Sequence, residues 1–322
     1  MRLHRFGVML WRIPGEDWVH KIRRLEELGY SSIMIPDHPN TQWCPIATQA
    51  AIASVTEKIK VGSMVFNMDF HHPVVLAKAS ATIQNLSRGR HEFGIGAGWD
   101  EPEYHKAGIR FDEAATRVAR MEEAIQIIQR MWVNELSSFE GEHYKVHDIP
   151  QAASHMHYGA PKTMLGAGGK RTLRIAGRYA DIVNVIPRIS GIKVSTDYVK
   201  AAIRDPLTYT RLNEKMGWVR ESAKRAGRDP DNIEYSYQYM PGTEITDNPE
   251  SAIRKRAKLV DVTTEDLVKS PNFFFGTLQD LRADIEERYE ATGIGYHVIP
   301  GNLEDFTKLE EFAAEVIKPL SR

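Results

Sequence analysis

Short apolar runs alternate with longer amphipathic segments along almost the whole chain. Runs of this length predict buried strands, whereas apolar residues three or four positions apart predict helices that pack against them. The strand-like runs are at 3–10, 32–35, 60–66, 91–95, 164–166, 181–186, 233–239 and 296–299. Regular alternation of this kind implies parallel strands joined by helical crossovers.

Helical periodicity fills most of the gaps between these runs. In the segment 18–28 the apolar positions recur at helical spacing, and Gly29 follows as a terminator. Further helices are predicted at 46–55, 73–86, 111–132, 173–177, 215–226, 249–260, 278–291 and 303–317. The segment 189–213 has no clear pattern, and the stretch from about 134 to 162 is irregular, with a hairpin turn at Glu140-Gly141.

This alternation predicts one α/β domain over residues 1–322, a (β/α)8 TIM barrel. The amino-acid composition does not change along the chain in a way that would mark a second domain. A doubly wound open sheet is the alternative. That fold would more naturally place its glycine motif after the first strand, where this chain has Leu10-Trp11-Arg12.

Composition and charge exclude several classes of protein. The chain has 42 basic and 43 acidic residues and no basic stripe, so nucleic acid is not an expected partner. The only cysteine, Cys44, excludes an intrachain disulfide framework and a cysteine-rich zinc site, and no metal is predicted. No apolar run approaches the length of a membrane span, and no signal peptide opens the chain, so we expect a cytoplasmic protein.

In a barrel of this kind the reactive end is built from the loops that follow the strands. The side chains and glycines there that suit binding or chemistry are Trp11, Asp37, His38, Trp43, Asn67, Ala97, Gly98, Trp99, Glu103, Tyr104, Ala167, Gly168, Gly169 and Arg171. The tryptophans offer apolar walls, and the glycine-rich loops offer backbone N–H groups. This inventory favours a flat heterocyclic ligand over a metal.

Two glycine-rich loops each leave two interpretations open. The loop that ends in Gly96-Ala97-Gly98 is either a tight strand-to-helix turn or the floor of a cofactor site. It is not a dinucleotide fingerprint, because Trp99 stands where the third glycine would be. Gly168-Gly169 is either a plain helix start or a phosphate cradle made of free N–H groups and the helix dipole.

Asp37-His38 is the best acid–base candidate. Histidine titrates near neutral pH, and an adjacent carboxylate could orient it or favour its charged form. The alternatives are a solvated pair in a loop, or a histidine whose hydrogen bond holds the loop.

Taken in order, the motifs resemble those of the bacterial luciferase-like flavin and deazaflavin oxidoreductases. The matching segments are Asp37-His38, Val61-Gly62-Ser63-Met64-Val65, Gly94-Ile95-Gly96-Ala97-Gly98-Trp99, Leu165-Gly166-Ala167-Gly168-Gly169, Arg178-Tyr179-Ala180-Asp181-Ile182-Val183-Asn184, Phe275-Gly276-Thr277 and Gly293-Ile294-Gly295-Tyr296. The resemblance implies a (β/α)8 barrel with an insertion after the fourth helix, and a homodimer. It also implies a site for FMN or the deazaflavin coenzyme F420 at the carboxyl ends of the strands.

The resemblance also assigns roles to residues. Met64-Val65 matches a non-proline cis peptide that bulges against the cofactor ring. We expect Asp37, His38 and Trp43 to act in catalysis, and Trp11 and Trp99 to form the substrate wall. The expected cofactor-binding residues are Met64, Val65, Asn67, Gly96, Ala97, Gly98, Ala167, Gly168, Gly169 and Arg171.

One departure from the resemblance bears on the substrate. F420-dependent sugar-phosphate dehydrogenases have a glutamate acid at the position of Trp99, so a bulkier apolar or aromatic substrate is favoured here. We predict an F420-dependent oxidoreductase that transfers a hydride between the deazaflavin and a small organic molecule. An FMN-dependent monooxygenase supplied with reduced flavin by a separate reductase is the alternative, and a non-catalytic flavin-binding barrel is a third hypothesis.

Overall fold

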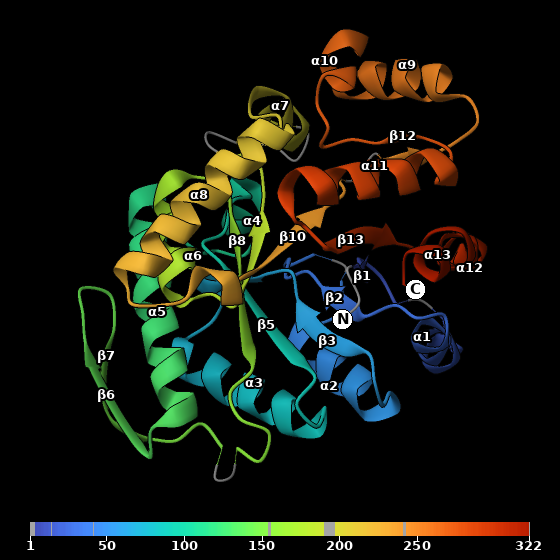
Figure 1. Cartoon of the computed structure of the whole chain (residues 1–322). Helices are drawn as coiled ribbons and strands as arrows, with labels where there is room; N and C mark the ends of the chain where they lie inside the picture. Colours follow the sequence, from blue (N-terminus) through green and yellow to red (C-terminus); the bar gives the residue numbers. More distant parts are fainter. Residues whose placement is uncertain are drawn as a thin grey trace.

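Eight parallel strands close into a barrel at the centre of the molecule (Figure 1). The computed structural model describes residues 4–13, 15–40, 42–153, 156–189, 197–240 and 243–321. The barrel strands are β1 (Arg5–Leu10), β2 (Ser32–Ile35), β3 (Lys60–Ser63), β5 (His91–Gly96), β8 (Lys162–Ala167), β9 (Ile182–Val185), β10 (Glu234–Gln238) and β13 (Tyr296–Gly301). Their hydrogen-bonded order is β3-β2-β1-β13-β10-β9-β8-β5, and a β3–β5 pairing closes the ring. The predicted (β/α)8 barrel is confirmed.

Helices surround the barrel and bury their apolar faces against it (Figure 1). They are α1 (Trp18–Glu27), α2 (Pro45–Val55), α3 (Pro73–Leu86), α5 (Ala114–Val133), α6 (Lys170–Tyr179), α8 (Tyr209–Arg225), α11 (Leu278–Thr292) and α12 (Phe306–Phe312), which continues through η3 (Ala313–Ile317) into α13 (Lys318–Leu320). Most predicted helices are confirmed with small shifts at their ends. The helix expected at 111–132 instead begins at Ala114 and is preceded by a separate helix, α4 (Glu101–Lys106), which stops before Gly108 at a φ of 69°.

Two additions extend the barrel. The antiparallel hairpin of β6 (Leu136–Glu140) and β7 (Lys145–Pro150) follows α5, in the stretch where a hairpin was predicted. After β10 come β11 (Glu244–Ile245), α9 (Pro249–Val260), α10 (Thr264–Val268) and β12 (Phe275–Gly276). The helices α7 (Asp197–Arg204), α9 and α10 lie at the top of Figure 1 and contribute to an apolar cluster separate from the main core. The part of the unpatterned segment at 190–196 lies outside the described residues.

The third barrel strand is interrupted where the sequence predicts a continuous run from 60 to 66. β3 ends at Ser63, a cis peptide bond joins Met64 to Val65, and β4 (Phe66–Asn67) then resumes pairing with β5 and leads into η1 (Met68–Phe70). The cis peptide that the resemblance implied is therefore present. A Cβ at Gly94 would lie 1.9 Å from the Ser63 carbonyl oxygen, so only glycine permits this approach.

Alternate strand residues fill the barrel in layers. At the amino-terminal ends of the strands, Arg5, Lys60, Glu92 and Glu234 form ion pairs. An apolar layer inside the barrel consists of Met9, Met34, Met64, Met164, Ile182, Tyr296 and Val298, with Trp11 and Val65 packed against it. Trp11 follows β1, so its indole marks the carboxyl-terminal end of the barrel.

Candidate active site

A histidine and a glutamate from two separate loops meet at the carboxyl-terminal end of the barrel. His38 lies shortly after β2, and Glu103 lies in α4, which follows β5. His38 Nδ1 is 2.7 Å from Glu103 Oε2, and the two side chains are only 13% and 17% exposed. The carboxylate therefore fixes the orientation of the imidazole.

Two indole rings flank the same imidazole. The Trp11 ring lies nearly parallel to the His38 ring, with centroids 5.4 Å apart and an interplanar angle of 21°. Trp99 meets His38 edge-on at 6.1 Å and 81°. The structure thus brings both predicted wall residues against the predicted catalytic histidine, although they come from different loops.

Asp37 does not orient His38, which corrects one of the two roles that the sequence suggested for it. Asp37 Oδ2 accepts hydrogen bonds from the backbone N–H of Asn67 at 3.0 Å and from His71 Nε2 at 2.7 Å. Adjacent residues of an extended chain point in opposite directions. Asp37 therefore secures the loop after β4, while Glu103 holds His38.

Asn67 and Tyr104 fix α4 in position. The Tyr104 hydroxyl lies 3.0 Å from Asn67 Oδ1 and 2.9 Å from Asp69 Oδ2, and burial raises the pKa of Tyr104. Gly98 has a φ of 71°, and a Cβ there would lie 1.8 Å from the Tyr104 hydroxyl oxygen. Gly98 therefore allows Tyr104 to pack beneath the loop, and the neighbouring Glu103 reaches His38.

One glycine of β5 and one of β8 also accommodate protein atoms. A Cβ at Gly96 would lie 2.7 Å from Val65 Cγ2, and one at Gly166 would lie 3.6 Å from the same side chain. The bulge at Met64-Val65 thus inserts Val65 into space that β5 and β8 leave empty. Met64 is buried in the apolar layer below, and Ala97 is half-buried at the strand end.

Asp100 adds a second carboxyl group to the site. Burial, followed by the negative charge of Glu103, raises the pKa of Asp100, and His38 opposes this shift. The Asp100 Oδ1 atom is buried and has no hydrogen-bond partner among the residues that the structure describes. A buried polar atom of this kind is suited to a hydrogen bond from a ligand.

The two glycines of the loop after β8 have different surroundings. A Cβ at Gly168 would lie 2.2 Å from the Pro187 carbonyl oxygen, so this glycine allows the loop after β9 to approach closely. At Gly169 the nearest atom to an added Cβ is 3.8 Å away, and α6 begins there without a capping side chain. An uncapped, accessible helix start fits an anionic group such as a phosphate.

Two predicted site residues lie farther from this arrangement. Trp43 is 47% exposed and packs edge-on against Trp18, with ring centroids 6.3 Å apart. No ring contact joins Trp43 to His38 in the described parts of the chain. Arg171 is exposed, and its Nη1 donates to the Ala115 carbonyl oxygen at 3.1 Å. Ala167 is buried at the end of β8.

The sequence pattern places Glu103 among the loop residues suited to chemistry, but it gives no specific role to Glu103, Asp100 or His71. The loop after the fourth strand contains three carboxylates within four positions, 100 to 103. Their spacing does not tell which of them faces the loop after the second strand. That choice depends on the short helix α4, which the sequence pattern did not reveal.

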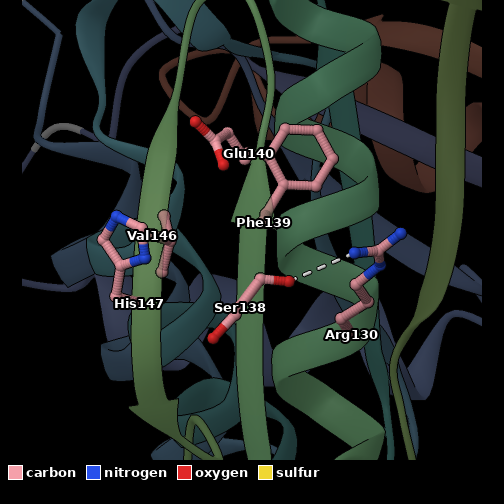
Figure 2. A pocket seen from close by; sticks show the side chains of 6 residues that line it. All are labelled: Arg130, Ser138, Phe139, Glu140, Val146 and His147. Atoms are coloured by element: carbon pink, nitrogen blue, oxygen red, sulfur yellow. Dashed lines mark hydrogen bonds between the residues drawn. The ribbon is translucent and has the colours of Figure 1, made fainter.

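A shallow hollow of about 280 Å³ lies elsewhere, on the hairpin (Figure 2). It is lined by Arg130, Ser138, Phe139, Glu140, Val146 and His147. These residues come from α5, β6 and β7, and none of them comes from a loop at the carboxyl end of a barrel strand. We therefore do not assign it to the chemistry.

The part of the chain that the structure describes has neither a metal-ligand cluster nor a membrane-spanning helix. Within the described ranges, no three histidine, cysteine or acidic side chains are grouped so that they could hold a metal ion. No helix in that part of the chain is both long and apolar enough to cross a bilayer.

Two curated relatives are identical to this chain at about a quarter of the aligned positions. An F420-dependent glucose-6-phosphate dehydrogenase of Intrasporangium calvum is 26% identical over 334 residues, which covers 96% of this chain and 98% of that protein. The protein of the same name in Amycolatopsis mediterranei is 28% identical over 203 residues, covering 59% of this chain and 58% of the relative. In that second match, the chain spans little more than half the length of the relative.

Solved structures share the fold over their full length. The coenzyme F420-dependent tetrahydromethanopterin reductase of Methanopyrus kandleri has a TM-score of 0.77 at 21% identity, covering 98% of this chain and 99% of that one. The FMN-bound oxygenating constituent of 3,6-diketocamphane monooxygenase from Pseudomonas putida has a TM-score of 0.71 at 19% identity, covering 100% and 98%. The luciferase-like monooxygenase family matches residues 12–293. The chain therefore belongs to the luciferase-like monooxygenase family, a family of oxidoreductases.

Proposed function

We propose that this protein is an F420-dependent oxidoreductase that exchanges a hydride with a small apolar or aromatic organic molecule. The observation that carries the proposal is the His38–Glu103 pair, held between Trp11 and Trp99 where the barrel strands end. The full-length match to a dehydrogenase named as F420-dependent supports the choice of cofactor.

The residues present fit a phosphate-bearing deazaflavin. Val65, supported by the glycines of β5 and β8, would lie against the ring, and the uncapped start of α6 at Gly169 would receive the phosphate. Asp100 Oδ1 offers a hydrogen-bond acceptor that no described residue uses. When bound, the cofactor supplies the hydride chemistry, and the protein supplies orientation and electrostatics.

His38 handles the proton that accompanies hydride transfer. An ionised Glu103 carboxylate can only accept a hydrogen bond, so His38 Nδ1 carries a proton and Nε2 remains for the substrate. Nε2 can take a proton from a substrate hydroxyl, or return one to a carbonyl oxygen in the reverse direction. The nearby carboxylate stabilises the imidazolium form in either direction.

Trp11 and Trp99 set the substrate class. Both indoles contact the His38 ring, so a substrate that reaches His38 also lies beside an apolar wall. A sugar phosphate would gain little from such a wall, whereas an apolar or aromatic alcohol or carbonyl compound would bury its surface there. We therefore propose a different substrate from that named for the curated relatives.

Cofactor binding tests the proposal directly. We expect fluorescence titration to give saturable binding of F420 that is at least about tenfold tighter than binding of FMN, a difference of about 1.4 kcal/mol. Tighter binding of FMN would instead support a monooxygenase that takes reduced flavin from a separate reductase. If the chain bound neither compound, the proposed function would be wrong.

A further inference from the structure

Lys215, in α8, is a fully buried lysine whose ammonium group joins three segments of the chain. Its Nζ donates to the carbonyl oxygens of Gly168 at 2.9 Å and Ile186 at 2.8 Å. It also lies 2.6 Å from Asp205 Oδ2, in the segment between α7 and α8. All three N–H donors of the ammonium are thus used.

Asp205 connects this ammonium to further groups. Its Oδ2 also accepts a 2.6 Å hydrogen bond from the backbone N–H of Arg188, and its Oδ1 accepts a 2.7 Å bond from Arg211 Nε. Although burial acts in the opposite direction, these bonds hold the pKa of Asp205 below its ordinary value. A charged pair with every hydrogen bond in place gives the loops after β8 and β9 one defined arrangement.

Other residues of α8 contact α6, the helix that begins directly after Gly169. Lys170, the first residue of α6, lies over the Trp218 ring at 5.1 Å. A Cβ at Gly177 of α6 would lie 2.4 Å from the Val219 carbonyl oxygen, so the two helices are in close contact. Residues 215, 218 and 219 share one face of α8. This face of α8 therefore contacts α6 at three places: the loop that precedes α6, the first residue of α6 and the third turn of α6.

We propose that Lys215 is a positioning residue that sets the opening turn of α6 for the phosphate of the cofactor. The carbonyl and the N–H of one trans peptide point in opposite directions. By holding the Gly168 carbonyl oxygen, Lys215 therefore turns the N–H of Gly169 to the other side, where α6 begins. The ammonium itself is enclosed by protein acceptors and does not contact the phosphate. This inference deepens the proposed function and rests on it.

The experiment compares F420 with a deazaflavin that lacks the phosphate. F420 carries the phosphate and the tail attached to it, whereas its ribityl precursor, called the riboside here, has the same ring without either. The wild-type chain should bind F420 more tightly than the riboside. In Lys215→Met we expect the affinity for F420 to fall about tenfold, on the scale of an anion at a helix start, and the affinity for the riboside to stay within about twofold.

Lys224→Met is the matched control, because Lys224 is an exposed lysine of the same helix. It should leave both affinities unchanged. Asp205→Asn provides a second variant if the methionine variant does not fold, because it keeps Lys215 and weakens its anchor. This variant should also lower F420 affinity selectively, by a smaller factor than Lys215→Met.

The outcomes separate the inference from the proposed function. A wild-type chain that binds neither deazaflavin overturns the proposed function. A wild-type chain that prefers F420, together with folded variants that keep that preference, overturns the role of Lys215 alone. Equal losses for F420 and the riboside in Asp205→Asn or Lys215→Met would also overturn it, because they would show a general disturbance of the site.

Discussion

The two ends of the barrel hold charged groups in different ways. At the amino-terminal end, Arg5 pairs with Glu234 at 2.5 Å and with Glu92 at 3.0 Å, and Lys60 pairs with Glu92 at 3.1 Å. The Arg5 guanidinium also lies 3.4 Å from the centroid of the Tyr296 ring. Two cations face two carboxylates, so the charges at this end compensate one another.

At the carboxyl-terminal end, two side chains have polar atoms that are not used in hydrogen bonds within the described residues. His38 has one nitrogen bonded to Glu103, and the other remains for a ligand. Asp100 Oδ1 has no hydrogen-bond partner in the described structure. We propose that the end whose charges are paired stabilises the fold and that the other end performs the chemistry. Substitutions at the two ends should therefore affect different measurements.

His38→Asn should give the largest change, and only in activity. Loss of the proton-handling group should lower hydride-transfer turnover by about 10²- to 10⁴-fold, because general acid–base catalysis contributes on that scale. The absorbance of the deazaflavin reports the turnover. F420 affinity and the urea midpoint should change little. Equal losses of turnover and cofactor affinity would show that His38 is structural.

Glu92→Gln should lower the stability of the fold and leave the activity of the folded protein unchanged. It leaves Arg5 and Lys60 without their shared buried carboxylate, and breaking a buried pair in this way costs about 3–5 kcal/mol of unfolding free energy. Urea denaturation measures the loss. The exposed Glu27→Gln, which breaks a surface pair with Arg24, is the control and should have little effect. If the Glu92→Gln variant lost activity at a temperature at which it is folded, stability and activity would not be divided between the two ends of the barrel.

Acid should destabilise the amino-terminal end through His91, the first residue of β5. Burial lowers the pKa of His91 to about 4, although Val61 and Glu92 act in the opposite direction. Below about pH 6.5, His91 is protonated in the unfolded chain but stays neutral in the folded chain. The contribution of His91 to the free energy of unfolding is therefore complete above pH 6.5 and is lost as the pH falls towards 4, a change of about 3 kcal/mol. His91→Gln should therefore flatten the dependence of the urea midpoint on pH across that interval. An unchanged slope would contradict the assignment.

Glu103→Gln should give the smallest of these changes. The amide can keep a hydrogen bond to His38 but lacks the charge that stabilises the imidazolium. We expect turnover to fall about ten- to a hundredfold, less than for His38→Asn. Asp37→Asn is the informative comparison, because Asp37 bonds to His71 and not to His38. A larger loss of turnover in Asp37→Asn than in Glu103→Gln would reverse the assignment of the orienting carboxylate.

The sequence predicted the barrel because strand and helix periodicities differ and alternate regularly. It also predicted the place of the Met64-Val65 bulge, and it indicated the loops in which we propose that the site lies. It could not predict what the glycines accommodate: Gly96 and Gly166 make room for Val65, which is a contact across strands. A local pattern shows that bulk is missing but does not show which group occupies the space.

The sequence also paired His38 with the wrong carboxylate. Adjacency along the chain suggested Asp37, whereas the structure pairs His38 with Glu103, 65 positions away. The difference arises from α4, a helix too short to show a clear periodicity. Because its placement depends on Tyr104 and Gly98, only the folded chain reveals that Glu103 faces the histidine.

Hydrogen–deuterium exchange of the full chain, with and without F420, tests most directly that the cofactor site lies at the carboxyl-terminal end. We predict protection on addition of F420 in peptides that cover 37–38, 64–67, 96–103 and 167–171. Peptides at the strand starts, such as those around Arg5 and Glu234, and the β6–β7 hairpin should exchange as before. Protection confined to the strand starts or the hairpin, or no protection anywhere at saturating F420, would contradict the account.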